Sequence, residues 1–458
     1  MSKGKNKKRD YAPSPYALKD AIIKGNWMTK LSMLLCGFGC LMHKQIVKGI
    51  VFLAVEVAFI WFMVSKGFGF LAGLPGLGES EQGKVWNEAL GVFEYSEGDN
   101  SVLILLYGVA TCFVVLGFLL FWVVQLKQAY KLECYQAKGK HINSLAEDFK
   151  SLVDQNLHIT LMTLPCLAIL LFNIVPLVFM ISMAFTNYSK QGKHLILFDW
   201  VGLKNFITVL NMNGSLGKQF WSVLGWTLVW AVFATFLNYL LGMILAMIIN
   251  RKGTKLKAMW RFFFVLSIAV PQFVSLLIMR TMLQDQGAIN VMLQSLGITH
   301  APIHFMTDPT LARITVIVVN LWVGIPYTLL QVTGILQNIP VELYEAAKVD
   351  GAGPATIFFK ITLPYMLFVT TPYLITQFTG NVNNFNVIYL LSGGGPTPVG
   401  ASAGKTDLLV TWLYKLTVDQ QYYNIGAVIG IFTFVILSVV ALVTYRNSGS
   451  YKNEEAFM

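Results

Sequence analysis

The feature that most constrains this chain is a series of apolar runs, each long enough to cross a lipid bilayer. A membrane-spanning helix needs about 20 mostly apolar residues. Eight runs meet that length, at residues 46–65, 102–124, 159–185, 221–249, 262–283, 314–336, 365–391 and 425–445. Only 12% of the residues are charged, about half of the share that is usual in soluble proteins. We therefore predict an all-α integral membrane protein with about eight transmembrane helices.

The distribution of basic residues predicts how these helices are oriented. Lysine and arginine are dense in the N-terminal segment MSKGKNKKRD and in the segments that follow the second and fourth runs. Residues 67–100 contain a single lysine, Lys84, and six carboxylates. Basic loops stay in the cytoplasm and the number of spans is even. We therefore expect a multi-pass protein of a bacterial-type cell membrane with both chain ends in the cytoplasm.

The same pattern predicts the layout of the chain. Residues 1–45 form a basic cytoplasmic N-terminus, and its short apolar segment 31–40 is expected to be re-entrant or interfacial. Two transmembrane helices and a cytoplasmic linker follow over residues 46–155. A six-helix core is expected over 156–446, and a cytoplasmic tail over 447–458.

Carboxylates are nearly absent from the apolar runs, and this bears on the energy source. Ion-driven transporters usually place acidic residues or histidine within their helices. Glu56 is the one carboxylate within the eight runs. A structural role for Glu56 is favoured over an ion relay, because a relay needs more than one station. The five cysteines predict neither a disulfide nor a metal site, and no catalytic residues are predicted. Energy is therefore expected to come from a partner protein.

Side-chain amides are the polar groups that the runs do contain. They are Asn320, Gln377, Asn381, Asn383, Asn384 and Asn386. Unsatisfied amides in hydrocarbon are costly, so most of them should face a wet cavity. Proline and glycine at Pro271, Gly324, Pro326, Pro372 and Gly380 are expected to break their helices locally. Amides together with aromatic faces favour a polar, uncharged substrate.

Residues 342–364, between the sixth and seventh runs, are predicted to form a cytoplasmic helix–turn–helix. Good helix formers at 345–348 start it. Gly351, Gly353 and Pro354 then make a sharp turn, and a second short helix over 355–361 leads to Pro364. A rigid element of this kind can dock in a partner and pass its motion to the transmembrane helix that follows.

This segment resembles the coupling-loop signature of membrane subunits of ATP-binding-cassette (ABC) importers. The signature is EAA, three residues, G, nine residues and I-x-L-P, and every stated position is met. The later runs NNFNVIYLLSGGGP and TDLLVTWLYKL resemble the larger permease subunit of maltose/maltodextrin importers. The resemblance covers roughly residues 155–446 and implies the type I ABC importer permease fold.

The resemblance also implies roles for particular residues. The expected ATPase-coupling residues are Glu345, Ala346, Ala347, Asp350, Gly351, Ile361 and Pro364. The expected substrate contacts are Asn320, Gly324, Tyr327, Gln377, Asn381 and Asn384. The chain departs from the characteristic residues of the family at Ile268, Gln272, Gln377 and Gly380. Two of these departures, at Ile268 and Gly380, remove an aromatic ring that could stack on a sugar.

The function that follows is that of a non-enzymatic permease subunit for maltose or malto-oligosaccharides, which forms half of the translocation pathway. The resemblance implies three kinds of protein partner: a second permease subunit, two ABC ATPase subunits and an extracytoplasmic sugar-binding protein. Membrane lipid is a further expected partner. No nucleic acid partner is expected. ATP and magnesium would belong to the ATPase, and this chain would bind no cofactor. The alternatives are another neutral oligosaccharide, such as a galacto-oligosaccharide, and, less favoured, an ion-coupled secondary transporter. A membrane enzyme is disfavoured because it would need acidic and histidine clusters.

Overall fold

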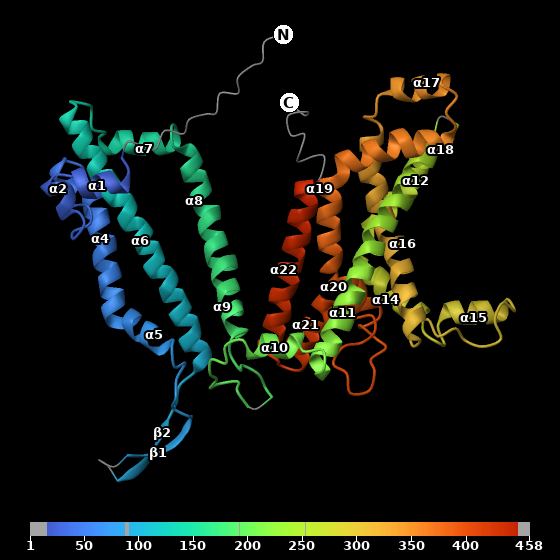
Figure 1. Ribbon diagram of the computed structural model, residues 1–458, viewed down its shortest axis with the longest axis horizontal. Helices are drawn as coiled ribbons and strands as arrows, with labels where there is room; N and C mark the ends of the chain where they lie inside the picture. Colours follow the sequence, from blue (N-terminus) through green and yellow to red (C-terminus); the bar gives the residue numbers. More distant parts are fainter. Residues whose placement is uncertain (1–15, 88–90, 192, 252, 448–458) are drawn as a thin grey trace. The chain divides into compact units, whose positions relative to one another are not determined.

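The computed structural model describes residues 16–87, 91–191, 193–251 and 253–447 (Figure 1). Seven helical stretches in this part of the chain are long and apolar enough to cross a membrane. They are Ile46–Gly73, Ser101–Ala137, Leu157–Met183, Ser215–Asn250, Pro309–Leu336, Pro354–Leu391 and Tyr423–Arg446. An eighth is a broken pair, Lys257–Ala269 with Gln272–Met282. The predicted all-α fold with about eight spans is confirmed.

Proline breaks one of these helices but not the others. Helices α13 (Lys257–Ala269) and α14 (Gln272–Met282) meet at an angle of 87°, and Pro271 lies at the break. The prediction of a break is wrong at Pro326, which lies inside the continuous helix α16 (Pro309–Leu336), and at Pro372, which lies inside α19 (Leu363–Val382). A proline within a helix removes one hydrogen bond, and packing against neighbouring helices can compensate for that loss.

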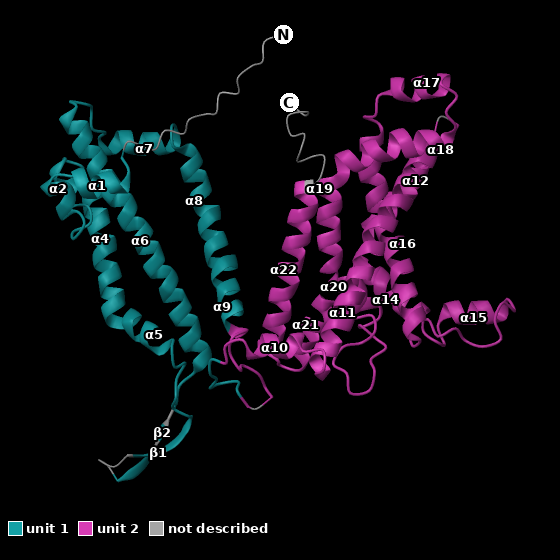
Figure 2. Ribbon diagram, viewed as in Figure 1, with its two compact units in different colours: residues 1–182, 194–200 teal, residues 183–193, 201–458 magenta. Residues whose placement is uncertain are grey.

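The chain divides into two compact units (Figure 2). Unit 1 comprises residues 1–182 and 194–200, and unit 2 comprises residues 183–193 and 201–458. The units are defined by internal packing alone. The predicted domain boundaries at residues 45, 155 and 446 therefore remain predictions.

The described residues of unit 1 form three long membrane helices, a set of short N-terminal helices and one hairpin. The short helices are α1 (Leu18–Lys24), α2 (Trp27–Leu31) and α3 (Phe38–Met42). The first span consists of α4 (Ile46–Phe62), the π-helical turn η1 (Met63–Gly67) and α5 (Phe68–Gly73). Strands β1 (Gly83–Asn87) and β2 (Val92–Ser96) then pair in antiparallel fashion. The remaining elements are α6 (Ser101–Ala137), α7 (Leu145–Val153), α8 (Leu157–Ile169), η2 (Leu170–Ile174) and α9 (Val175–Met183).

The apolar segment 31–40 of unit 1 is held by polar side chains from the membrane helices. The Oε2 atom of Glu56 accepts the backbone N–H of Cys36 at 2.7 Å. The side chain of Gln125 accepts the N–H of Gly37 at 3.2 Å and donates to the carbonyl of Ser32 at 2.8 Å. Glu56 is only 8% exposed and Gln125 is fully buried. Glu56 therefore has a backbone hydrogen-bond partner within the protein, as we expect of a carboxylate with a structural role.

Helix α7 is amphipathic and begins with a reciprocal capping box. The Ser144 hydroxyl accepts the N–H of Glu147, and the Glu147 carboxylate accepts the N–H of Ser144. This backbone hydrogen bond, together with one from His141, lowers the pKa of Glu147 from 4.5 to about 2. The capping box fixes the point at which the chain turns from α6 to run along α7.

Unit 2 contains the other membrane helices. Before the broken span lie α10 (Lys204–Leu210), α11 (Ser215–Val232), η3 (Phe233–Leu237) and α12 (Asn238–Asn250). After it come α15 (Ala288–Ser295), α16, α17 (Val341–Val349), α18 (Pro354–Ile357), η4 (Phe358–Thr362), α19, α20 (Phe385–Leu391), α21 (Leu409–Tyr414), η5 (Lys415–Asp419) and α22 (Tyr423–Asn447). Helices α17 and α18 lie at one end of this unit, and α15 and α21 lie at the other (Figure 1).

The core of unit 2 places α12, α16 and α19 around a common space. Trp226, Trp230, Val316 and Ile388 belong to one buried apolar cluster that joins α11, α16 and α20. Helices α12 and α16 lie side by side. Their backbones come close at Gly242, because this residue has no side chain. A Cβ atom there would lie 2.7 Å from the Thr328 side chain. Small residues at such a crossing are typical of membrane helix packing.

Candidate substrate cavity and coupling loop

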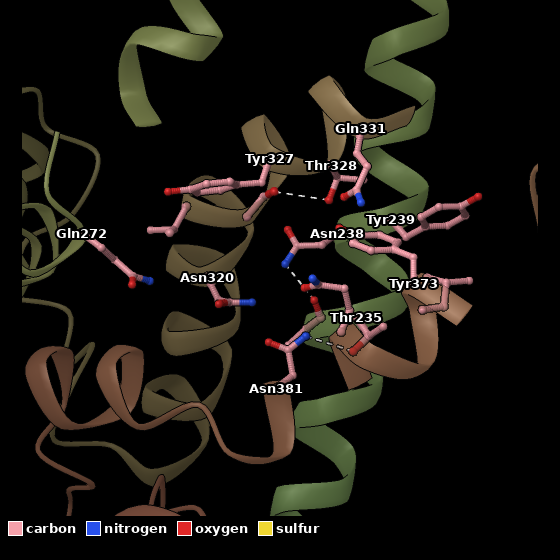
Figure 3. A pocket seen from close by; sticks show the side chains of 15 residues that line it. Thr235, Asn238, Tyr239, Gln272, Asn320, Tyr327, Thr328, Gln331, Tyr373 and Asn381 are labelled. Atoms are coloured by element: carbon pink, nitrogen blue, oxygen red, sulfur yellow. Dashed lines mark hydrogen bonds between the residues drawn. The ribbon is translucent and has the colours of Figure 1, made fainter. Parts of the chain in front are cut away.

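Unit 2 contains a polar cavity of about 310 Å³ between η3, α12, α14, α16 and α19 (Figure 3). Its lining residues are Ala234, Thr235, Asn238, Tyr239, Gln272, Asn320, Val323, Gly324, Tyr327, Thr328, Gln331, Tyr373, Leu374, Gln377 and Asn381. None of these side chains carries a formal charge. The volume lies at the lower end of the range of about 300–1,000 Å³ that is usual for small-molecule sites.

Helical periodicity explains why these residues meet. On α16, Asn320, Gly324, Tyr327 and Gln331 are separated by four, three and four residues. On α19, Tyr373, Gln377 and Asn381 are separated by four residues each. Residues three or four apart lie on the same face of a helix. Each helix therefore presents one polar stripe, and the two stripes face the same space.

Two buried polar atoms in the cavity lack a hydrogen-bond partner within the described residues. They are Oδ1 of Asn238 and Nδ2 of Asn320, and these residues are only 7% and 5% exposed. The other amide atom of Asn238 is occupied, because Nδ2 donates to the carbonyl of Ala234 at 2.8 Å. A buried polar atom without a partner is costly. The residues that line the cavity thus include one acceptor atom and one donor atom that no described residue satisfies.

Asn381 is oriented by its neighbours in the protein. Its Nδ2 donates to Oγ1 of Thr235 at 3.0 Å, and its backbone carbonyl accepts the indole N–H of Trp230 at 3.0 Å. These bonds tie α19 to η3 and α11 just before α19 ends at Val382. The Asn381 amide is therefore fixed at the edge of the cavity (Figure 3).

Five of the six residues predicted as substrate contacts line this cavity: Asn320, Gly324, Tyr327, Gln377 and Asn381. Asn384 is not among the lining residues. Its side chain accepts the N–H of Val387 at 3.2 Å and so caps the N-terminus of α20, because the helix breaks after Val382 and the new helix needs a cap. Contact of these residues with a substrate remains a prediction.

Several lining residues were not predicted from the sequence. Asn238 and Gln331 are amides within the fourth and sixth apolar runs, so the argument applied to the other amides would have found them. Gln331 also lies eleven residues from Asn320, on the same face of α16. Tyr239 and Tyr373 carried no such signal, because a tyrosine whose hydroxyl finds a partner packs within a helix bundle without marking a site. The hydroxyl of Tyr239 lies 2.7 Å from Oγ1 of Thr370.

The predicted coupling segment forms an exposed helix and a tight turn. Helix α17 ends with the N–H of Asp350 bonded to the carbonyl of Ala346 at 3.0 Å. Gly351 follows in the left-handed conformation, with φ of +76°, which favours glycine. Glu345, Ala346 and Asp350 are exposed.

The second half of the coupling segment differs from the prediction. Helix α18 starts at Pro354, and the helical stretch runs on through η4 into α19 instead of ending before Pro364. Pro364 is exposed and lies at the start of α19, within this continuous helical stretch. Ile361 is half-buried within η4.

One side-chain contact joins the two halves of the coupling segment. The hydroxyl of Tyr344 on α17 lies 3.2 Å from Oγ1 of Thr362 in η4. Several apolar side chains of α17 are exposed, and Val349 is 88% exposed. Clustered apolar exposure outside the spans is typical of protein contacts.

Helices of membrane length surround an uncharged polar cavity. An exposed helix and turn lie at one end of the unit. This combination is that of a membrane transport subunit. A family model described as "Binding-protein-dependent transport system inner membrane component" matches residues 238–449. Over 432 residues the chain is 35% identical to the maltodextrin transport system permease protein MdxF of Bacillus subtilis (strain 168), covering 92% of this chain and 95% of MdxF. The chain belongs to this family of binding-protein-dependent transport permeases.

Other relatives agree with this assignment. The galactooligosaccharides transport system permease protein GanP of the same bacterium is 36% identical over 422 residues, which cover 91% of this chain and 96% of GanP. The maltose/maltodextrin transport system permease protein MalF of Salmonella typhimurium (strain LT2) is 40% identical over 253 residues, 54% of this chain and 48% of MalF. A solved bacterial ABC transporter involved in alginate import shares the fold, with a TM-score of 0.52 and 23% identity over 66% of this chain and 97% of that chain. As a member of this family, the chain is a permease subunit of a binding-protein-dependent transport system.

Proposed function

We propose that this permease carries maltose or malto-oligosaccharides, and that the cavity between α12, α16 and α19 is where the sugar passes. The observation that supports this most directly is a cavity lined by amides, hydroxyls and tyrosines with no charged side chain. A neutral oligosaccharide offers many hydroxyl donors and acceptors and no charge, so uncharged polar groups match it. The names of MdxF and MalF point to the same class of sugar.

Particular atoms of the cavity suit a sugar. Oδ1 of Asn238 can accept a hydroxyl hydrogen, and Nδ2 of Asn320 can donate to a hydroxyl oxygen. Tyr327 lines the cavity and is 52% exposed, so its ring offers a face for stacking (Figure 3).

The coupling role falls on the segment from α17 to η4. We infer that Glu345 and Gly351 seat this segment in a cleft of a separate ABC ATPase, which binds ATP and magnesium. Closure of two such ATPase subunits would move α17. The Tyr344–Thr362 contact and the helical continuity into α19 would transmit that movement to the cavity wall. A second permease subunit completes the pathway, an extracytoplasmic sugar-binding protein delivers the sugar, and both chain ends lie in the cytoplasm.

A galacto-oligosaccharide is the second candidate cargo. GanP is 36% identical to this chain and MdxF is 35% identical, so overall identity does not separate the two sugars. Both classes are neutral and rich in hydroxyl groups, and the cavity chemistry accommodates either.

Uptake by vesicles that contain the reconstituted complex tests the proposal. Labelled maltotriose should enter the vesicles only when ATP is present on the side of the membrane where the ATPase is bound. Unlabelled malto-oligosaccharide should compete for uptake better than unlabelled galacto-oligosaccharide. Uptake driven by a proton or sodium gradient without ATP would refute the importer mechanism. The opposite order of competition would assign the second cargo.

A matched pair of variants tests the cavity itself. Asn381→Ala removes an amide from the cavity edge and should weaken uptake, because its substrate-facing group is lost. Asn386→Ala removes the same group from an exposed position in the same asparagine-rich run, outside the cavity, and should leave uptake unchanged. Equal uptake by both variants, with both inserted in the membrane, would argue against a sugar site at the end of α19.

A further inference from the structure

A second polar cavity lies within unit 1. Its lining residues are far along the chain from those of the first cavity. It has a volume of about 380 Å³. It is formed where α4 begins, where α6 ends and along α7. Its lining residues are Gln45, Lys48, Gln128, Lys131, Leu132, Tyr135, Ile142, Asn143, Asp148, Ser151, Leu152, Gln155 and Asn156. The permease mechanism described above uses none of them.

The charge of this cavity favours an anion. Its lining contains two lysines and one carboxylate. Nζ of Lys48 lies 2.7 Å from Oδ2 of Asp148, which leaves the charge of Lys131 uncompensated. Nζ of Lys131 stands 5.3 Å from the centre of the Tyr135 ring, and within the described residues it forms no ion pair. Lys140 approaches the same ring at 5.8 Å and adds a further positive charge nearby.

The cavity also presents a buried acceptor without a donor. Gln45 is only 9% exposed. Its Nε2 donates to the carbonyl of Asn143 at 3.1 Å and approaches Oδ2 of Asp148 at 3.4 Å. Its Oε1 is buried and has no partner among the described residues. Because buried acceptors are normally satisfied, a ligand for this cavity should carry a hydroxyl group as well as a negative charge.

The surroundings place this cavity at the depth of lipid head groups. The first apolar span begins at Ile46, directly after Gln45. Helix α7 exposes Leu145, Phe149 and Val153 to 47%, 63% and 71%, while its polar side lines the cavity. A short helix with this amphipathic character lies in the membrane interface, with its apolar side in the acyl boundary. We therefore expect the cavity to lie at the depth of the phospholipid phosphates.

We propose that this cavity binds the head group of an anionic phospholipid with a phosphate and free hydroxyls, such as phosphatidylglycerol, from the leaflet predicted to be cytoplasmic. The ammonium groups of Lys131 and Lys48 contact the phosphate oxygens, and Oε1 of Gln45 accepts a head-group hydroxyl. Basic pockets at the ends of membrane helices are suited to such head groups. The bound lipid would join α4, α6 and α7 at the point where the first two spans meet the linker.

Native mass spectrometry of the full chain tests this proposal. The protein is released from nanodiscs that contain equal amounts of phosphatidylglycerol and phosphatidylcholine, and the retained lipid is counted. The wild-type chain should retain one phosphatidylglycerol in preference to phosphatidylcholine. Lys131→Gln should lower the affinity at least about tenfold, because it removes a hydrogen bond between charged groups at the phosphate. Lys131→Arg keeps the charge and should retain the lipid.

The matched control is Lys127→Gln. Lys127 lies one turn earlier on α6, is exposed and does not line the cavity, so its loss changes the surface charge by the same amount. An equal decrease in retention for Lys127→Gln and Lys131→Gln would overturn the proposal in favour of general surface attraction. Equal retention of both lipids by the wild-type chain would overturn it too.

A soluble phosphate ester with hydroxyl groups would offer this cavity the same groups as the lipid head group. Glycerol 3-phosphate is therefore titrated into the detergent-solubilised chain. Binding that depends on Lys131, without retention of phosphatidylglycerol, would assign the cavity to a soluble ligand and refute the lipid. This assay measures no transport, so its outcome is independent of the proposed sugar specificity.

Discussion

Gly324 makes room for a cavity side chain, and replacing it should damage transport more than folding. A Cβ atom at position 324 would lie 2.5 Å from Nδ2 of Asn238 and 2.8 Å from both Cγ and Oδ1. Contacts this close are not sustained in proteins, so Gly324→Ala forces the Asn238 amide out of its place. Oδ1 of Asn238 is the unpartnered acceptor that we assign to the sugar.

Two opposing contributions set the effect of Gly324→Ala on the free energy of unfolding, and one lost hydrogen bond sets its effect on uptake. Alanine is favoured over glycine in a helix interior by about 1 kcal/mol. Moving Asn238 breaks its 2.8 Å bond to the carbonyl of Ala234, which costs about 0.5–1.5 kcal/mol. These terms nearly cancel, so the free energy of unfolding should change by less than about 1 kcal/mol. Losing one neutral hydrogen bond to the sugar should raise the KM for uptake about 2- to 12-fold.

Gly334→Ala is the matched control for this prediction. Gly334 lies on the same helix, and a Cβ atom there would meet nothing within 4 Å. This variant should be slightly stabilised and transport normally. The assays are thermal unfolding in detergent and the concentration dependence of maltotriose uptake in vesicles with the reconstituted complex.

Two results would refute the reasoning. One is an unchanged KM for Gly324→Ala in a correctly inserted protein. The other comes from the double variant Asn238→Ala/Gly324→Ala. Because the clashing side chain is absent there, the double variant should transport no worse than Asn238→Ala alone. A further loss in the double variant would show that position 324 acts by another route.

Three other perturbations have definite expectations. Glu56→Ala leaves the buried N–H of Cys36 without an acceptor and should lower the free energy of unfolding by about 1–3 kcal/mol. Glu56→Gln keeps an acceptor oxygen and should lower it less. Equal losses of stability in thermal unfolding would show that this hydrogen bond does not stabilise the protein. The pKa of Glu147 is lowered from 4.5 to about 2, so its stabilisation of the first turn of α7 is complete above about pH 4.5 and is lost as the pH falls through 2. Hydrogen-exchange protection of that turn should fall across this window, and Glu147→Gln should remove the step. Gly351→Asp strains a left-handed position and adds charge to the turn, so it should reduce co-purification of the ATPase; Gly353→Asp, at a negative φ, adds the same charge without strain and should reduce it less.

The cavity shows how far sequence reasoning reaches. The amides Asn320, Gln377 and Asn381 were predicted to face a wet cavity, and they line a polar cavity. Asn384 belongs to the same asparagine-rich run, yet it caps α20. The run does not show where α19 ends, and that end decides which asparagine points into the cavity and which serves the backbone.

The prolines give the same lesson for helix continuity. Pro271 lies at an 87° break, whereas Pro326 lies in a continuous helix. Both remove a backbone donor, so their local chemistry is the same. Burial does not by itself separate the two cases. Pro326 is buried and Pro271 is exposed, but Pro372 is exposed too, and α19 runs through it without a break.

The sequence by itself determined the all-α membrane class, the number of spans and the shortage of charge within them. These are local properties, because the bilayer requires each span to be apolar and to satisfy its own backbone. Only the tertiary structure decided that Glu56 holds the segment before its own helix, and that Gly324 serves by leaving space for Asn238. It also decided that Lys131 and Gln45 share a cavity. Each of these depends on residues that are distant in the chain and meet only when the helices pack.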